Sequence, residues 1–209
     1  MIAGRRIGLD FDNTIVLYDR VFCELGSRAG LLPAGFSGGK DDVRATIRAL
    51  PDGETKWTAL QAEVYGPGIA EADLAPGLTD FLATCRRHDC DLVIVSHKTE
   101  FAAAAPTGTN LRQAARDWIR AQKLSTSAGG LIDDEKIFFA DTRAAKIAQI
   151  VQLGCHSFVD DLEEVFLEPS FPADIDRHLM KIGAADLPAG PFTAWRSFVD
   201  LQGAWFGGR

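Results

Sequence analysis

The sequence predicts an α/β fold, in which a Rossmann-like parallel sheet lies between two layers of helices and carries a small helical insert. Four short apolar runs are continuous rather than alternating, which is typical of strands buried on both faces. Helical patterns separate these runs, and such an alternation builds a mostly parallel sheet through right-handed crossovers. The predicted strands are IGLDF from Ile7, LVIVS from Leu92, KIFFA from Lys136 and SFVDD from Ser157.

Three helices are expected between the predicted strands. Residues 76–90 carry an apolar stripe at helical spacing. A second helix begins after Asn110 and has Gln113 three positions later, as a capping box does. A third has Thr142 as its N-cap and Gly154 as its stop signal.

The segment 18–75 interrupts the alternation of strands and helices. It is too long for a simple crossover, and turn residues divide it into short helical pieces. We therefore expect a core of residues 1–17 and 76–209 and a helical insert of residues 18–75. Near the C-terminus, DIDRHLMKI from Asp174 is expected to form an edge strand, and TAWRSFVDLQGAWF from Thr193 a closing amphipathic helix.

The composition is that of a globular protein. Hydrophobic residues make up 46% of the 209 residues and charged residues 24%, which is typical of a chain that buries a sizeable core. The formal net charge of −7 argues against nucleic acid as a partner, because contacts with its phosphates need positive charge. A small anionic substrate is compatible with this charge if a cation neutralises the site.

The N-terminal sequence and the lack of a long apolar stretch predict a cytoplasmic protein without a membrane partner. Arg5 and Arg6 are followed by Asp10 too soon for the apolar core of a signal peptide, and no later stretch is long and apolar enough to span a membrane. The four cysteines form no C-x-x-C pair and no zinc-like spacing. We expect them to be small buried apolar residues.

Acidic pairs stand at the ends of two predicted strands. Asp10 and Asp12 end the first strand, and Asp160 and Asp161 end the fourth. Ligands of parallel sheets bind at the carboxyl ends of the strands, where Ser96 also falls. Carboxylates that converge there repel one another unless a cation lies between them or one keeps its proton. Oxygen ligands of this kind suit Mg²⁺, which we expect as the cofactor.

The motifs LDFDNTIV, VIVSHKT, Lys146 and FVDDLEEV resemble, in this order, the four motifs of the haloacid dehalogenase-like (HAD) superfamily. The resemblance covers approximately residues 6–20 and 76–167. It implies that the insert, which lies between motifs one and two, is a small helical cap. In this family such a cap closes over the site, excludes water and supplies most substrate contacts.

The resemblance also implies a role for each motif residue. Asp10 would be the nucleophile that forms an aspartyl-phosphate, and Asp12 would protonate the leaving alcohol and then activate water. Ser96 would hydrogen-bond the transferring phosphoryl oxygens, and Lys146 would neutralise charge on Asp10 and the phosphate. The metal ligands would be Asp10, Asp12 through its backbone carbonyl, Asp160 and Asp161.

Two of these assignments stay open. The family commonly has glycine and aspartate where this chain has Asp160 and Asp161, so either carboxylate could be the direct metal ligand. Lys136 and Lys98 are alternatives to Lys146 as the motif-three lysine. We prefer Lys146 because it lies early in the helix that leads into the Asp160 strand.

Further residues are candidates for substrate contacts. His97 and Lys98 directly follow Ser96 and could contact the substrate or lie in a surface loop. Phe36, Trp57 and Tyr65 of the insert could line the substrate pocket, but aromatic residues in a small helical piece more often form its own core.

These inferences predict a Mg²⁺-dependent phosphohydrolase that cleaves a small phosphomonoester, such as a sugar phosphate or a similar metabolite, through an aspartyl-phosphate. Asp12 favours a phosphatase over a dehalogenase, because dehalogenases of the superfamily use the first aspartate alone. Two alternatives remain. One is a phosphotransferase that passes the phosphoryl group to an alcohol, and the other is a non-catalytic regulatory module that binds phosphate.

Overall fold

The computed structural model describes residues 2–105 and 108–207, which form two compact units. Each unit buries apolar residues of its own. The first, called the core unit, comprises the described residues of Met1–Val16, Leu74–Lys98 and Arg120–Arg209. The second, called the helical unit, comprises the described residues of Leu17–Asp73 and Thr99–Ile119.

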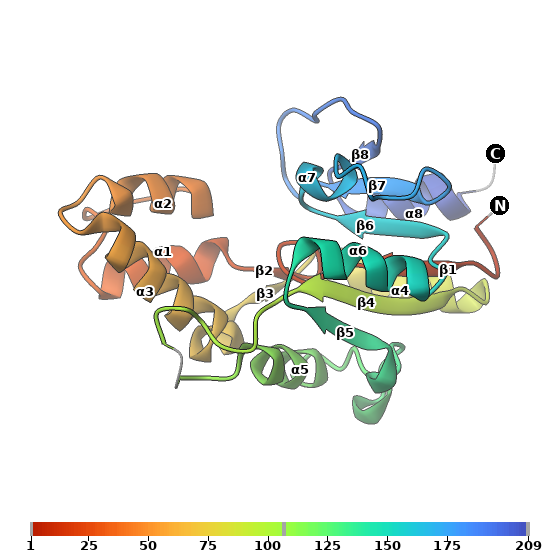
Figure 1. Ribbon diagram of the computed structural model, residues 1–209, viewed down its shortest axis with the longest axis horizontal. Coiled ribbons are helices and arrows are strands. Elements are labelled where there is room, and N and C mark those ends of the chain that lie inside the picture. The colour runs from red at the N-terminus through yellow and green to blue at the C-terminus, as the bar shows by residue number, and fades with distance from the viewer. Residues whose placement is uncertain (1, 106–107, 208–209) are drawn as a thin grey trace. The chain divides into compact units, whose positions relative to one another are not determined.

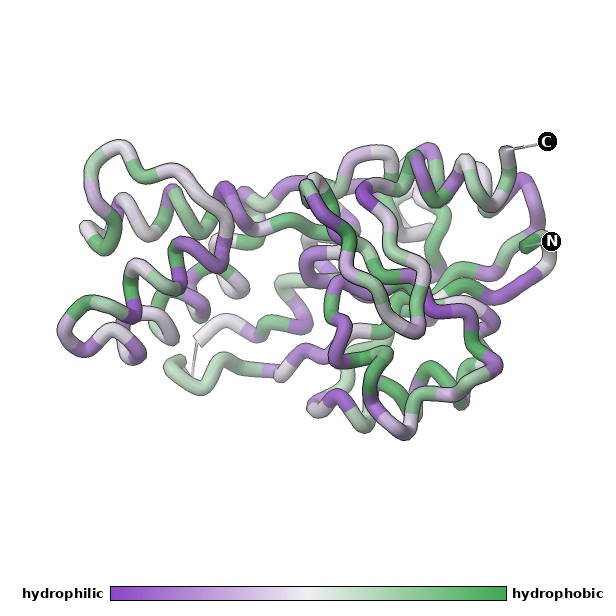
Figure 2. Tube along the Cα trace, turned by 90° about the horizontal axis from the view of Figure 1, so that it is seen from above, coloured by the Kyte–Doolittle hydropathy of each residue, from purple (hydrophilic) through white to green (hydrophobic). Residues whose placement is uncertain are grey.

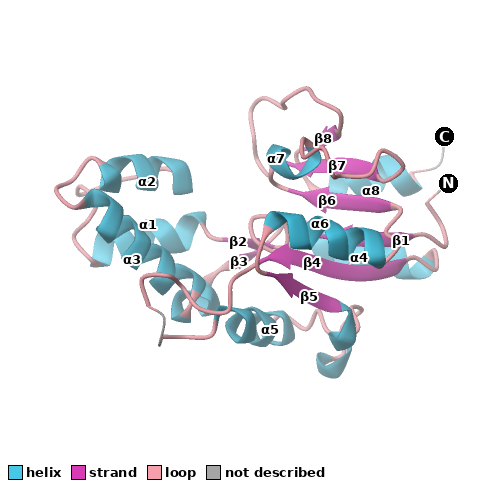
Figure 3. Ribbon diagram, viewed as in Figure 1, coloured by secondary structure: helices cyan, strands magenta, loops and turns pink. Residues whose placement is uncertain are grey.

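The core unit is built on a six-stranded sheet whose neighbouring strands are all parallel (Figures 1 and 3). The spatial order is β5-β4-β1-β6-β7-β8. All four strands predicted from the apolar runs are present, which confirms the α/β fold class. The strands are β1 (Arg6–Leu9), β4 (Asp91–His97), β5 (Ile137–Ala140), β6 (Ser157–Asp160), β7 (Asp176–Met180) and β8 (Thr193–Trp195).

Helices cover both faces of this sheet. On one face α6 packs against β4 and β5, and on the opposite face α4 and α8 pack together (Figure 1). Thr142 caps α6 as expected, since its hydroxyl accepts a hydrogen bond from the Ala145 N–H at 3.1 Å. No helix in the described part of the chain is long and apolar enough to cross a membrane. The helices and short 3₁₀ turns of this unit are α4 (Leu78–Arg87), η2 (Thr126–Ala128), η3 (Asp134–Lys136), α6 (Arg143–Gln152), α7 (Glu163–Phe166) and α8 (Phe198–Phe206).

Apolar side chains fill the space between the sheet and its helices. On the α4 and α8 face, the rings of Phe81 and Phe198 lie with their centroids 5.1 Å apart. Burial of each such side chain contributes about 1.5–3 kcal/mol to folding. Cys85, Cys90 and Cys155 are buried free thiols, as expected, whereas Cys23 is half-buried. The cluster on the α6 face includes Val93, Val95, Ile147, Ile150, Phe158, Val165, Phe166 and Leu179.

Gly8 in β1 allows β6 to approach closely. The two strands pair with Gly8 opposite Phe158, and a Cβ atom added at Gly8 would lie 2.4 Å from Cδ2 of that ring. Phe158 is fully buried, so it has little room to move. We expect Gly8→Ala to lower the free energy of unfolding by about 1–3 kcal/mol, as overpacking of a core does.

Urea unfolding tests this close approach by comparing the stability of Gly8→Ala with that of the control variant Gly203→Ala. Gly203 lies within α8, and a Cβ atom there would meet nothing within 4 Å. Gly203→Ala is therefore expected to raise stability by up to about 1 kcal/mol through helix propensity. Equal effects of the two substitutions would contradict the steric role of Gly8.

The C-terminal part of the sheet differs from the sequence-based expectation in two ways. The strand after Asp174 is β7, which is not an edge strand, because β8 pairs with it on its outer side. Residues 193–195, expected in the closing helix, form β8, and the helix begins only at Phe198. Ser197 caps it, since its hydroxyl accepts from the Asp200 N–H at 3.1 Å. The helical spacing of apolar residues continues through a short strand, so the periodicity did not reveal the boundary.

The helical unit has an aromatic core. The rings of Phe22 and Trp57 stack with centroids 5.1 Å apart, and Tyr65 packs edge-on against Phe22 at 5.6 Å and against Tyr18 at 4.9 Å. Trp57 therefore belongs to the core of this unit, as expected. Hydrophobic and hydrophilic residues alternate along its helices (Figure 2). The helices are α1 (Asp19–Arg28), α2 (Lys40–Arg48), α3 (Gly53–Tyr65), η1 (Pro67–Glu71) and α5 (Leu111–Ala121).

The described residues of the range 99–119 group with the helical unit, whereas the sequence-based boundaries assigned this range to the core. The Trp118 indole N–H of α5 donates to the Ala72 carbonyl at 3.3 Å. The amphipathic pattern of α5 predicts a buried face but does not say which part of the chain covers it. A separate two-stranded sheet of β2 (Val16–Leu17) and β3 (Asp73–Leu74) lies where the chain passes from one unit to the other.

Candidate active site

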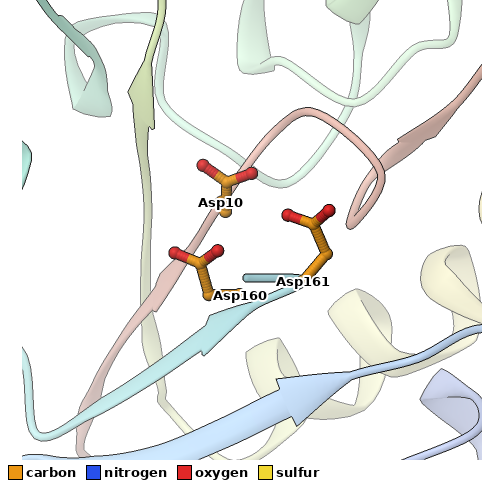
Figure 4. Close-up of side chains that lie close together, drawn as sticks. All are labelled: Asp10, Asp160 and Asp161. Carbon is orange, nitrogen blue, oxygen red and sulfur yellow. The ribbon is translucent and has the colours of Figure 1, made fainter. Parts of the chain in front are cut away.

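Three carboxylates gather at the carboxyl ends of β1 and β6. Asp10 directly follows β1, and its N–H donates to the Val159 carbonyl of β6 at 2.8 Å. This contact places Asp10 beside Asp160 and Asp161, and each of the three offers an oxygen within 4.8 Å of the others. The three side chains lie close together (Figure 4). Asp10 and Asp160 are buried and Asp161 is half-buried, so their repulsion is only weakly screened by water.

Lys146 of α6 lies between two of these carboxylates. Its Nζ is 2.5 Å from Asp10 Oδ1 and 2.6 Å from Asp160 Oδ2, and its side chain is 2% exposed. Lys136, an alternative from the sequence, pairs with Asp91 at 2.7 Å and Asp133 at 2.9 Å. Asp91 begins β4, so Lys136 lies toward the amino ends of the strands. Of these two lysines, the structure therefore brings Lys146 to the carboxylates.

Burial and neighbouring charges shift the pKa values of Asp10 and Lys146. Burial raises the pKa of Asp10 to about 7, with Lys146 opposing the shift and Asp160 and Asp12 adding to it. Burial alone would lower the pKa of Lys146, but Asp10 and Asp160 raise it above its ordinary value. Lys146 thus stays protonated, and the negative charge around it is not fully compensated by protein groups. Such a site favours binding of a cation.

The donor set suits a hard divalent cation. Mg²⁺ takes oxygen ligands at about 2.0–2.1 Å and usually uses one or two carboxylates, with water and substrate phosphate completing its octahedron. Asp10, Asp160 and Asp161 offer oxygens close enough together to share one ion. The two oxygens of Asp160 already accept from protein donors, Oδ2 from Lys146 and Oδ1 from the Leu162 N–H at 3.0 Å.

Asp12 lies in a tight turn after β1. The turn is closed by a hydrogen bond from the Ile15 N–H to the Phe11 carbonyl at 2.9 Å, and Asn13 adopts a φ of 56°. Asparagine tolerates this left-handed conformation better than most residues. The Asp12 side chain is 24% exposed, and its Oδ2 lies 2.8 Å from Nζ of Lys98.

Ser96 and His97 end β4, the neighbour of β1. Leu9 of β1 lies opposite Ile94, so Ser96 is two residues beyond this pair, at the same sheet edge as Asp10. Ser96 is buried and His97 is exposed. The His97 Nε2 atom lies 3.0 Å from the Asp141 carbonyl oxygen.

No protein-family model matches the sequence, and no curated protein matches it. Solved structures do match. YfnB from Bacillus subtilis, described as a putative HAD-hydrolase, is 14% identical, with 98% of this chain and 99% of that chain covered and a TM-score of 0.56. A predicted phosphoglycolate phosphatase from Haemophilus somnus is 13% identical over 96% and 97% of the two chains, with a TM-score of 0.56. Protein Tyrosine Kinase A from Mycobacterium tuberculosis is 17% identical over 97% and 98%, with a TM-score of 0.63.

This chain has the HAD fold. The fold that the four motifs implied is therefore confirmed. In this HAD fold the first motif follows β1, the second ends β4, the third lies in α6 and the fourth ends β6. The sheet order places β1 between β4 and β6, which explains how motifs separated by up to 150 residues along the chain (Asp10 to Asp160) reach one edge of the sheet.

One residue at this edge of the HAD fold was missed by the sequence analysis. Lys181 directly follows β7, and its Nζ donates to the backbone carbonyl of Asp161 at 2.7 Å. The available signal was a lysine immediately after the predicted strand DIDRHLM. Every residue has a backbone oxygen, so the sequence does not show which one a lysine contacts. The position of Lys181 after the strand therefore could not identify Asp161 as its partner.

Proposed function

We propose that this protein is a Mg²⁺-dependent phosphohydrolase that cleaves a small phosphomonoester through an aspartyl-phosphate at Asp10. The observation that carries the proposal is the buried group of three carboxylates with Lys146 between two of them. A structural role accounts poorly for it, because buried ion pairs seldom add stability over apolar packing. Two proteins of the same fold support the proposal by their names, one described as bound to magnesium and the other as a predicted phosphatase.

The proposed reaction has two displacements at phosphorus. A carboxylate oxygen of Asp10 forms a bond to phosphorus while the bond to the leaving oxygen breaks, and Asp12 gives its proton to that oxygen. In the second step Asp12 takes a proton from water. The resulting hydroxide attacks phosphorus, breaks its bond to Asp10 and releases phosphate. Asp12 is then protonated again, and Asp10 is again a carboxylate.

The remaining motif residues would hold the phosphoryl group and the metal. Lys146 and Ser96 would bind the phosphoryl oxygens, and Mg²⁺, when bound, neutralises charge that develops on them. Asp10, the Asp12 carbonyl and one of the carboxylates of Asp160 and Asp161 would be its direct ligands.

The proposal extends to the helical unit and the cellular setting. We propose that the helical unit is the cap that supplies substrate contacts, with a small phosphorylated metabolite as the substrate. We include residues 99–119 in this cap because the described residues of this range group with residues 17–73 in one unit. The cytoplasmic location expected from the N-terminal sequence stays a prediction.

A phosphotransferase is the second candidate. Protein Tyrosine Kinase A, which shares this fold, carries a name that denotes phosphoryl transfer to an acceptor other than water. The same aspartyl-phosphate could be attacked by an alcohol in place of water, with Asp12 taking the alcohol proton. Product analysis with added alcohols separates the two candidates, since a phosphotransferase makes a new phosphomonoester and less free phosphate.

The proposed function is tested by phosphate release from a panel of sugar phosphates, nucleotides and other phosphomonoesters, with Mg²⁺ and with EDTA. We expect hydrolysis of at least one compound, a loss of about 100-fold or more with EDTA, and recovery with excess Mg²⁺. Release that is equal with Mg²⁺ and with EDTA would overturn the metal dependence. No release from any compound would overturn the proposed activity.

A further inference from the structure

Lys98 is one of the most deeply buried charged residues of the core unit. Its side chain is 3% exposed, and its Nζ lies 2.8 Å from Asp12 Oδ2. The ammonium group also lies 5.6 Å from the ring centroid of Phe11, and the backbone N–H donates to the Ala140 carbonyl of β5 at 3.0 Å. Lys98 is therefore held at both its backbone and its charged end, directly after β4.

The burial of Lys98 is costly and is not explained by stability. Removing an ammonium group from water costs several kcal/mol. An ion pair with a partly exposed carboxylate offsets only part of this cost. Asp12 is such a partner, with 24% of its side chain exposed. What the contact does achieve is to hold Oδ2 of Asp12 at 2.8 Å from the buried ammonium group.

The two aspartates of the first motif thus have separate lysines. Lys146 contacts Asp10 and Asp160, whereas Lys98 contacts Asp12. When the four carboxylates of the site are ionised, they outnumber its three ammonium groups, which are those of Lys98, Lys146 and Lys181. The site therefore keeps a net negative charge that favours a cation, and Lys98 does not compete for the carboxylates of Asp10, Asp160 and Asp161.

We propose that Lys98 is a positioning residue that orients the Asp12 carboxylate for proton transfer, an inference that rests on the proposed function. Lys98 holds Oδ2 of Asp12 through a charge-assisted hydrogen bond. The other carboxylate oxygen gives its proton to the leaving alcohol in the first step and takes one from water in the second. Lys98 itself takes no part in the proton transfer and contacts neither the phosphoryl group nor the metal. This role differs from the substrate contact considered from the sequence.

A double-mutant cycle on the full chain tests the proposal. Steady-state kinetics with Mg²⁺ compare wild type, Lys98→Met, Asp12→Asn and the double variant, on the compound of the panel that wild type hydrolyses fastest. Lys98→Met is expected to lower kcat by about 10- to 100-fold, a share of what general acid–base catalysis contributes, with KM changed by less than about threefold. In the Asp12→Asn background the same substitution should change kcat by less than about twofold.

Other outcomes would overturn this role. A lysine that binds substrate would give a raised KM that persists in the Asp12→Asn background. A purely structural lysine would lower activity by the same factor in both backgrounds. Lys136→Met is the matched control, because that lysine pairs with Asp91 and Asp133 instead, and it should leave kcat unchanged. If Lys98→Met does not fold, Lys98→Gln, which keeps a donor for Asp12, enters the same cycle with the same expected non-additivity.

The failure of this inference is distinguishable from failure of the proposed function. Wild-type protein that releases no phosphate from the panel overturns both. Active wild-type protein with additive effects of Lys98→Met and Asp12→Asn overturns the role of Lys98 alone.

Discussion

Asp10→Asn is expected to abolish phosphate release while making the metal-free protein more stable at pH 8. The asparagine keeps an oxygen that can accept from Lys146, but its amide is a poor nucleophile. We therefore expect a loss of at least about 1,000-fold in kcat, which a phosphate-release assay measures. The gain in stability follows because the substitution removes a buried negative charge from beside Asp160 and Asp12.

The sign of the pH dependence follows from the raised pKa of Asp10. Its pKa is about 7 in the folded protein against 3.8 as the ordinary value, so between these pH values the folded state binds more protons than the unfolded state. Stability contributed by Asp10 therefore falls as pH rises from about 4 to 7, and the full penalty applies above 7. At pH 8, Asp10→Asn should be more stable than wild type by at least about 1 kcal/mol in EDTA.

Urea unfolding at pH 5 and pH 8, with EDTA and with Mg²⁺, measures this effect. The difference between Asp10→Asn and wild type should be clearly smaller at pH 5 than at pH 8. Mg²⁺ should stabilise wild type more than the variant, because the ion offsets the charge of Asp10. Asp176→Asn is the control, since that carboxylate is 56% exposed in a pair with Arg5 and surface pairs contribute little. A variant that is active, or less stable than wild type at pH 8, would contradict the role of Asp10.

Lys146→Met is expected to cause the largest loss of stability. It leaves Asp10 and Asp160 buried without the ammonium group that lies within 2.6 Å of both. Breaking a buried ion pair by removing one partner costs about 3–5 kcal/mol. Activity should be lost as well, because the variant cannot neutralise the phosphoryl group. Thermal and urea unfolding measure the first effect, and phosphate release measures the second.

Lys136→Met provides the matched comparison for Lys146→Met. Lys136 also pairs with two carboxylates, but its side chain is 37% exposed, so its removal should cost less than about 1 kcal/mol. Combining Lys146→Met with Asp10→Asn should recover part of the stability, because one unpaired buried charge is removed. Equal costs for the two lysines, or no recovery in the double variant, would show that Lys146 is not an electrostatic bridge.

Local sequence patterns were sufficient for the parallel core and for the acidic residues at its edge. A continuous apolar run such as LVIVS needs burial on both faces, and β4 forms there. Asp10 and Asp160 end such runs, so their meeting at one edge follows from parallel pairing. The pattern was insufficient at Thr193, where a three-residue strand is too short to interrupt the helical spacing around it.

The sequence by itself determined the α/β fold class, the four motifs and the carboxylate cluster. Continuous apolar runs predict the buried strands, and their alternation with helices predicts that the strands run parallel. Only the tertiary structure showed which lysine forms an ion pair with which carboxylate. Lys146 contacts Asp10, which lies 136 positions away along the chain, and Lys98 contacts Asp12. The tertiary structure also decided that residues 99–119 pack with the helical unit. Such partners depend on which surfaces meet after folding. The hydrophobic periodicity of one segment does not show which other segment packs against it.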